Sequence, residues 1–312
     1  MKQWMMWFGR SVLGCCLILH VAHAADTMAE YLSGIEVGSS ARMIRLGGIE
    51  GFSMSSEAVF QNPTRLGLVQ NFGVSFFSTT LMGEVSFLNA SAALNTPLGA
   101  FGVGFNTASV PGIPKTVLQT VGGVEFPVEV GTFSYNKTVM KGGYSAMLSQ
   151  EFLLGVGVSM YGSGVDTITS SGMDFDVGLS YEGESLAISA LLRNITSSKI
   201  TYSTGAFEQL PMETVLGAAW FGTEFWLLGQ LKMSGTKAAM VKSGAINYNP
   251  IIFPMMNVSF GYREVAFFKE IQSRMAVGVG LDLGKFSADY AYETSDFPEY
   301  PGHHYFSVAA SL

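Results

Sequence analysis

The sequence predicts an all-β fold, a transmembrane antiparallel β-barrel of about fourteen strands. Only 13% of the 312 residues are charged, whereas 37 are glycine, and soluble domains carry about 25% charge. Apolar residues recur at every second position, which places them on one face of a strand. No apolar run after residue 25 is long enough for a membrane helix. A closed barrel is the other structure that satisfies every backbone group in lipid.

The clearest alternation lies at the end of the chain, in residues 274–283, 286–293 and 305–312. Each run is about ten residues, the length with which a tilted strand crosses a bilayer. In the first run the apolar residues are Met275, Val277, Val279, Leu281 and Leu283. The opposite face carries glycine, serine, alanine and a few acids. Such a face suits the lumen of a closed barrel better than the surface of a soluble sandwich.

Similar alternation predicts strands upstream, at residues 72–76, 84–94, 101–106, 142–151, 154–160, 173–181, 186–194, 213–221, 224–234, 237–248 and 256–263. Residues 109–135 contain three prolines and broken alternation, so we expect a long loop there, with an internal hairpin left open. Short connections near 96, 152, 183, 223, 250 and 284 interleave with longer ones near 120, 167, 203, 268 and 298. This asymmetry is typical of periplasmic turns and extracellular loops. Trp220, Phe221, Phe225 and Trp226 flank one short turn, as an interfacial girdle would.

Residues 1–24 read as a secretory signal peptide, with basic Lys2 and Arg10, an apolar segment, and Ala22-His23-Ala24 before the cleavage site. The alternative is a lipoprotein signal ending at Cys15. Cleavage after Ala24 would remove both cysteines and leave 15 basic against 24 acidic residues. Without a basic patch, nucleic acid is not an expected partner. A secreted barrel is expected in the outer membrane of a diderm bacterium, surrounded by outer-membrane lipid and inserted by the barrel-assembly machinery.

Residues 25–70 do not alternate, and we expect them to form a hatch that precedes a barrel of residues 71–312. Part of this segment is similar to a known pattern: Ser39-Ser40-Ala41-Arg42, then Leu46-Gly47-Gly48, then residues 58–66 around Asn62-Pro63. It resembles the N-terminal signature of FadL-like and PorV-type outer-membrane proteins. Thr64 departs from the alanine usual there. Segments 193–211 and 289–307 resemble later parts of the same family.

The resemblance implies a fourteen-stranded barrel with an N-terminal hatch in its lumen. FadL-like members import long-chain fatty acids or other hydrophobic compounds, which leave through a gap in the wall. PorV-type relatives instead shuttle proteins in type IX secretion. The most favoured function is therefore passive uptake of hydrophobic small molecules, most of all long-chain fatty acids. A protein-binding accessory of a type IX-like secretion system and a structural surface protein are the alternatives.

Several residues are candidates for the site. Asn62-Pro63 is either an anchor of the hatch or a plain helix stop. Arg42 and Arg45 suit a carboxylate head group, yet they could equally pair with lumenal acids. The ligand and hatch candidates are Arg42, Ile44, Arg45, Leu46, Gly47, Gly48, Phe52, Asn62 and Pro63. The lumenal polar candidates are Asp174, Asp176, Arg263, Asp282 and Asp289.

The sequence offers no chemistry beyond binding. His303-His304 lacks a third ligand at metal spacing and is interpreted as interfacial, so neither a metal nor a cofactor is expected. No motif of a nucleotide-binding or hydrolytic enzyme is present, and we expect no catalytic residues. Because inward strand faces are polar, apolar contact with a ligand must come mostly from the hatch. This favours a short apolar pocket over a uniformly apolar tube.

Overall fold

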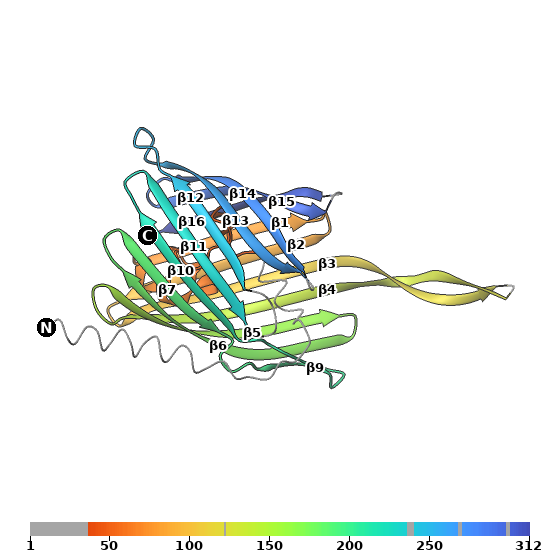
Figure 1. The fold of residues 1–312 in the computed structure, drawn as a ribbon. Coiled ribbons are helices and arrows are strands. Elements are labelled where there is room, and N and C mark those ends of the chain that lie inside the picture. The colour runs from red at the N-terminus through yellow and green to blue at the C-terminus, as the bar shows by residue number, and fades with distance from the viewer. Residues whose placement is uncertain (1–36, 122, 236–239, 268–269, 298–299) are drawn as a thin grey trace.

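A computed structural model describes residues 37–121, 123–235, 240–267, 270–297 and 300–312 (Figure 1). The predicted signal peptide, residues 1–24, and the first part of the predicted hatch, residues 25–36, lie outside the described residues. The helices are α3 (Ala41–Arg45), α4 (Ala58–Gln61) and the 3-10 helix η1 (Pro63–Leu68). The strands are β1 (Phe72–Leu81), β2 (Val85–Thr96), β3 (Gly99–Val121), β4 (Val124–Met147), β5 (Phe152–Val165), β6 (Ile168–Glu182), β7 (Leu186–Arg193), β8 (Lys199–Tyr202), β9 (Phe207–Gln209), β10 (Glu213–Phe221), β11 (Phe225–Ser234), β12 (Val241–Tyr248), β13 (Met256–Phe267), β14 (Glu270–Asp282), β15 (Phe286–Phe297) and β16 (Tyr300–Ser311).

Fourteen of these strands form a closed antiparallel barrel, and of the two short strands β8 pairs with β6 and β9 pairs with β8. The first and last strands close the ring, with Gly73 opposite Ser311 and Ser78 opposite Phe306. The amide of Leu312 donates to the carbonyl of Phe72 at 2.8 Å. Closure leaves no edge in the membrane. The predicted fold class and strand number are confirmed.

The outer surface of the barrel is apolar. Outward side chains such as Phe76, Val103 and Val277 are exposed by 47%, 63% and 47%, while the residues between them face the lumen. Such a band is suited to lipid, and we conclude that the chain is an outer-membrane protein. None of the helices in the described ranges is long and apolar enough to cross a membrane.

The prediction of a long loop at residues 109–135 is wrong, because this segment continues β3 and β4 as a two-stranded ribbon (Figure 1). β2 leaves β3 at Ser109 and β5 leaves β4 at Tyr135, so beyond these residues the two strands pair only with each other. The ribbon projects well past the rest of the barrel (Figure 1). Prolines are compatible with it because a strand edge without a neighbour tolerates a missing N–H.

Some connections between the strands differ in length from the prediction. Near residue 167, where a longer loop was expected, Asp166 and Thr167 form a tight turn between β5 and β6. Short turns and the C-terminus lie at one end of the barrel, whereas at the other end strands such as β3 and β4 extend further. The two ends therefore differ partly in strand length and not only in loop length. The expected aromatic girdle is only half present at the 222–224 turn. Trp220 and Phe225 are exposed, whereas Phe221 and Trp226 pack edge to face at 5.3 Å and contact the core.

Residues 37–70, here called the N-terminal segment, lie inside the barrel, and most of them are buried. Their helices contact strands on opposite sides of the ring, α3 against β13 to β16 and η1 against β2 to β6. The wall is notched to receive them. A Cβ added at Gly155 would overlap the backbone of Thr64, and one at Gly261 would overlap Gly47. The glycine-rich inner faces are therefore docking surfaces for this segment.

Candidate functional site: the N-terminal segment and the hollow beside it

Helix α3 is fixed to the wall by its capping residue and by Arg45. The Ser40 hydroxyl accepts from the amide of Met43 at 3.1 Å, a normal N-cap. Arg45, 2% exposed, places Nε and Nη2 each 2.9 Å from Oδ1 of Asp289. Its Nη1 donates to Asn247 Oδ1 and Ser259 Oγ, both at 2.9 Å. These contacts occupy four of the five N–H donors and pair the charge with Asp289, so Arg45 is not free for a ligand carboxylate.

Arg42 differs from its neighbour on the same helix. It is only half-buried and forms no hydrogen bond or ion pair with the described residues. Its charge acts on buried Glu57, whose pKa is raised by burial, with the Arg42 charge opposing that rise and Asp289 adding to it. Glu57 accepts from the hydroxyls of Ser40 at 3.0 Å and Ser53 at 3.2 Å. Of the two arginines predicted to receive a carboxylate, only Arg42 has no hydrogen bond or ion pair within the described residues.

The apolar candidates of the N-terminal segment pack against the wall, and its two glycine candidates form the turn after α3. Gly47 and Gly48 have φ of 69° and 68°, a region that disfavours other residues. Leu46 and Phe52 pack with Ile49 on inward alanines of the wall. Ile44 is fully buried in a separate cluster with residues such as Phe77 and Tyr305. None of these side chains lines the hollow described below.

Asn62 and Pro63 join α4 to η1 and touch the wall. The Asn62 Oδ1 accepts from the amide of Thr64 at 3.1 Å and its hydroxyl at 2.9 Å. Its Nδ2 donates to Ser189 Oγ on β7 at 2.7 Å, and Pro63 occupies the first turn of η1, where no N–H is needed. This geometry combines the helix stop and the wall contact that the sequence left as alternatives.

A buried ion network, which the sequence reading missed, holds the middle of the segment. Glu50 forms a salt bridge with Arg193 of β7, and Arg193 also lies 3.2 Å from Glu213 of β10. Lys232 of β11 lies 3.7 Å from Glu50 and 3.4 Å from Glu213. The sequence did place these wall residues on the inward faces of their strands, because they follow the inward phase of the residue alternation. Their mutual proximity follows only from the strand order.

The lumenal acids have separate roles. Asp174 accepts from Thr196 and Ser198 and so fixes the start of the 194–212 connection. Asp176 pairs with Lys141 at 2.9 Å and accepts from the amide of Asn194 at 3.1 Å. Arg263 is bidentate to Glu293, at 2.6 and 2.7 Å.

Asp282, predicted to face the lumen, lies at the end of its strand. Asp282 is exposed and accepts from the amide of Gly284 at 2.9 Å. β14 ends at this residue, so the inward phase of its alternation has already reached the rim of the barrel.

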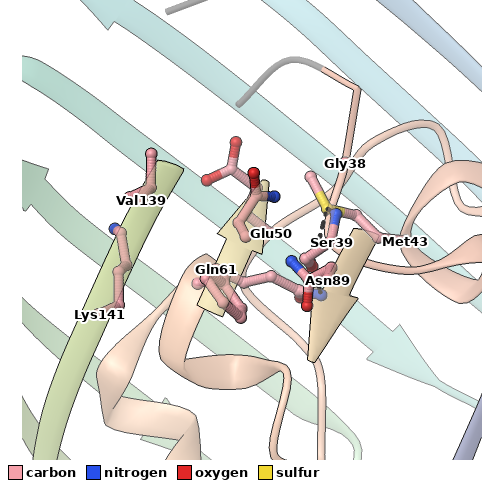
Figure 2. Close-up of a pocket in the computed structure, with 10 residues that line it drawn as sticks. Gly38, Ser39, Met43, Glu50, Gln61, Asn89, Val139 and Lys141 are labelled. Atoms are coloured by element: carbon pink, nitrogen blue, oxygen red, sulfur yellow. Dashed lines mark hydrogen bonds between the residues drawn. The ribbon is translucent and has the colours of Figure 1, made fainter. Parts of the chain in front are cut away.

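A narrow hollow lies between the wall and the N-terminal segment (Figure 2), and its volume of about 370 Å³ includes open solvent at its mouth. Figure 2 shows Val139 and Lys141 on one strand, across from Asn89, with Glu50 and Gln61 between them. The lining residues are Gly38, Ser39, Met43, Glu50, Phe60, Gln61, Asn89, Asn106, Val139 and Lys141. None of the predicted site residues lines it. Polar residues at inward strand positions were the signal that could have found it.

The histidine pair does not build a metal site within the described residues. His304 is exposed on the outer face, and its Nδ1 lies 2.7 Å from the hydroxyl of Tyr290. The described part of the chain contains no group of three or more potential metal ligands.

The sequence matches no family model and no curated protein. The structure is similar to the toluene transporter TodX of Pseudomonas putida, at 14% identity and a TM-score of 0.60, over 88% of this chain and 98% of that one. It is similar to the toluene transporter TbuX of Ralstonia pickettii, at 11% identity and a TM-score of 0.59, over 90% and 100%. A FadL homologue of Pseudomonas aeruginosa matches at 10% identity and a TM-score of 0.51, over 85% and 96%. The chain therefore has the fold of FadL-like barrels, as the sequence resemblance implied.

Proposed function

We propose that this protein is an outer-membrane channel for the passive uptake of small hydrophobic molecules. The observation that carries the proposal is a lumen filled by a separate segment, with a partly apolar hollow between that segment and the wall. A barrel with only a structural role needs no such segment. The similar structures include toluene transporters and a monoaromatic hydrocarbon channel, and this supports the same substrate class.

Within that class, long-chain fatty acids remain our proposed cargo, and Arg42 is the group suited to the carboxylate. It is the arginine of α3 that the wall does not neutralise. Each methylene that leaves water contributes about 0.8 kcal/mol, so a chain of many methylenes has a large drive to enter apolar surroundings. The channel is proposed to act without a cofactor, a metal or catalysis.

The test is whether uptake depends on this protein in a diderm host that lacks its own channels for hydrophobic compounds. Cells that express the protein should accumulate radiolabelled oleate or toluene faster than cells with an empty vector. Arg42→Ala should slow oleate uptake and leave toluene uptake unchanged. Uptake of both compounds that does not depend on the protein would refute the proposal.

The β3–β4 ribbon favours a second candidate, a protein-binding accessory of a type IX-like secretion system. Val117, Leu118 and Phe126 on the ribbon are exposed by 47%, 68% and 51%, and clustered exposed apolar residues often mark interaction sites. If this is the function, deleting residues 114–132 should abolish surface delivery of a secreted partner. If uptake is the function, the same deletion should leave oleate and toluene uptake intact.

A further inference from the structure

The connection between β12 and β13, residues 249–255, exposes a continuous run of apolar side chains and is here called the apolar turn. Ile251, Ile252 and Phe253 are exposed by 65%, 84% and 63%, and Pro254 and Met255 extend the run. The turn loops out at the end of the barrel where the C-terminus lies (Figure 1). Clusters of exposed large apolar side chains often mark an interaction surface.

An aromatic pair places the apolar turn at the edge of the membrane. Phe225 and Tyr248 are exposed, lie opposite each other on β11 and β12, and have ring centroids 4.8 Å apart. Exposed aromatic rings at the ends of barrel strands are typical of the membrane–water interface. The turn begins directly after Tyr248, so its side chains lie at the level of the lipid headgroups. Short turns are typical of the periplasmic end, and the nearest leaflet is therefore the inner one.

The apolar turn is continuous with the lipid-facing surface of the wall. Ile246 on β12 and Val258 on β13 are exposed on the outer face of the barrel. Tyr248 and Met256 follow them on the same face and lead into the turn from its two sides. Since no charged side chain separates the turn from the lipid-facing surface on these two strands, lipid is the partner that can cover both.

Charge indicates which part of a lipid the turn contacts. Residues 249–255 contain no charged side chain. The backbone amide of Asn249 donates to the carbonyl of Glu224 at 2.6 Å, and that of Asp282 donates to the carbonyl of Met255 at 2.7 Å. These neighbouring acidic residues disfavour an anionic headgroup. Contact must therefore come from apolar burial, and it stays at the interface because irregular backbone needs water for its polar groups.

The hairpin that ends in the apolar turn also holds α3. Asn247 of β12 and Ser259 of β13 both accept from Nη1 of Arg45, at 2.9 Å each. The Nδ2 of Asn247 in turn donates to Oδ1 of Asn249, at the base of the turn, at 2.9 Å. A side-chain chain of hydrogen bonds thus joins the apolar turn to the N-terminal segment.

We infer that the apolar turn inserts into the inner leaflet of the outer membrane and so holds the β12–β13 hairpin, and with it α3, in place. The partner is the apolar part of a phospholipid, at the boundary between headgroups and acyl chains. This interaction does not depend on which molecule the channel carries.

The experiment places a fluorescent bimane label at Ile252→Cys in the mature full-length protein, reconstituted in vesicles of phosphatidylethanolamine and phosphatidylglycerol. Lipid with a nitroxide near the start of its acyl chain should quench most of this fluorescence. The matched control is Glu184→Cys, exposed in the polar 183–185 turn at the same end of the barrel, and it should lose clearly less. Replacing phosphatidylglycerol by phosphatidylcholine should leave the quenching at residue 252 unchanged, because apolar contact needs no headgroup charge.

A second measurement tests the effect on α3. In the same vesicles, Ile251→Ser/Ile252→Ser/Phe253→Ser should speed amide hydrogen exchange in residues 41–48, whereas Glu184→Ser should leave it unchanged. Equal quenching at residues 252 and 184 would overturn the inference, as would unchanged exchange in the triple variant. A label at residue 252 that is shielded in native outer membranes but not in the vesicles would overturn it too, because a protein would then be the partner.

Discussion

Replacing Arg45 with leucine should destabilise the protein by detaching α3 from the wall. The change removes four donor contacts and leaves Asp289, itself 8% exposed, with no counter-charge from this side chain. Removing one partner of a buried ion pair costs about 3–5 kcal/mol. We expect a loss of that size in the free energy of unfolding, measured by urea titration in detergent at neutral pH.

The matched control is Arg42→Leu on the same helix. Arg42 is half-buried, bonds to none of the described residues and acts on Glu57 only through its charge, so its loss should lower the free energy of unfolding clearly less than the loss of Arg45 does. The double variant Arg45→Leu/Asp289→Leu should recover much of the lost stability, since no buried charge is then left unpaired. Equal effects of the two single arginine variants would refute the anchoring role of Arg45.

Three other perturbations test the fold and the buried segment. Val103→Asp, on the lipid face, should destabilise the barrel by about 2 kcal/mol and so reduce its assembly in the outer membrane. Asn106→Asp, on the lumenal face of the same strand, should assemble normally. Heat-modifiability gels measure the yield of each variant, and equal yields would contradict the register. Burial raises the pKa of Glu57, so its stabilising contribution is present below pH 4.5 and lost as the pH rises through the raised value. Glu57→Gln should therefore raise the melting temperature at pH 8 and leave it unchanged at pH 4; an equal shift at both pH values would contradict this. Replacing residues 114–132 by Asn-Gly should leave barrel yield unchanged, because the ribbon contributes no pairing to the wall; a loss of assembly would show otherwise.

The sequence was informative wherever one strand face meets lipid. Val277 and Val279 alternate with glycines because lipid and lumen select opposite residue types, and this contrast is visible without knowing any neighbouring strand. In the ribbon both faces meet water, so the contrast disappears. Pro114 and Pro127 then suggested a loop, although each is compatible with an unpaired strand edge.

The site was less predictable because it depends on contacts between distant parts of the chain. Glu50, Arg193 and Lys232 come together only once β7, β10 and β11 are adjacent. Arg45 was recognised as a partner for lumenal acid or ligand, and the choice between them required the position of Asp289. The sequence does not distinguish Asn89 from other inward polar residues, because the hollow that it lines forms between distant parts of the chain.

Because the N-terminal segment fills the lumen, we expect hydrophobic molecules to pass through the lumen only when this segment shifts. Ser56 and Ser75 offer a reversible test, since their hydroxyl oxygens lie 2.8 Å apart and join the segment to β1. The only cysteines of the sequence, Cys15 and Cys16, belong to the predicted signal peptide, so Ser56→Cys/Ser75→Cys would form a tether without competing thiols.

The decisive measurement is the uptake of radiolabelled toluene and oleate by cells that carry this double variant, under oxidising and then reducing conditions. We expect oxidation to lower uptake to the level of cells without the protein and reduction to restore it, while each single-cysteine variant stays active throughout. Full uptake by the oxidised, tethered protein would contradict the account.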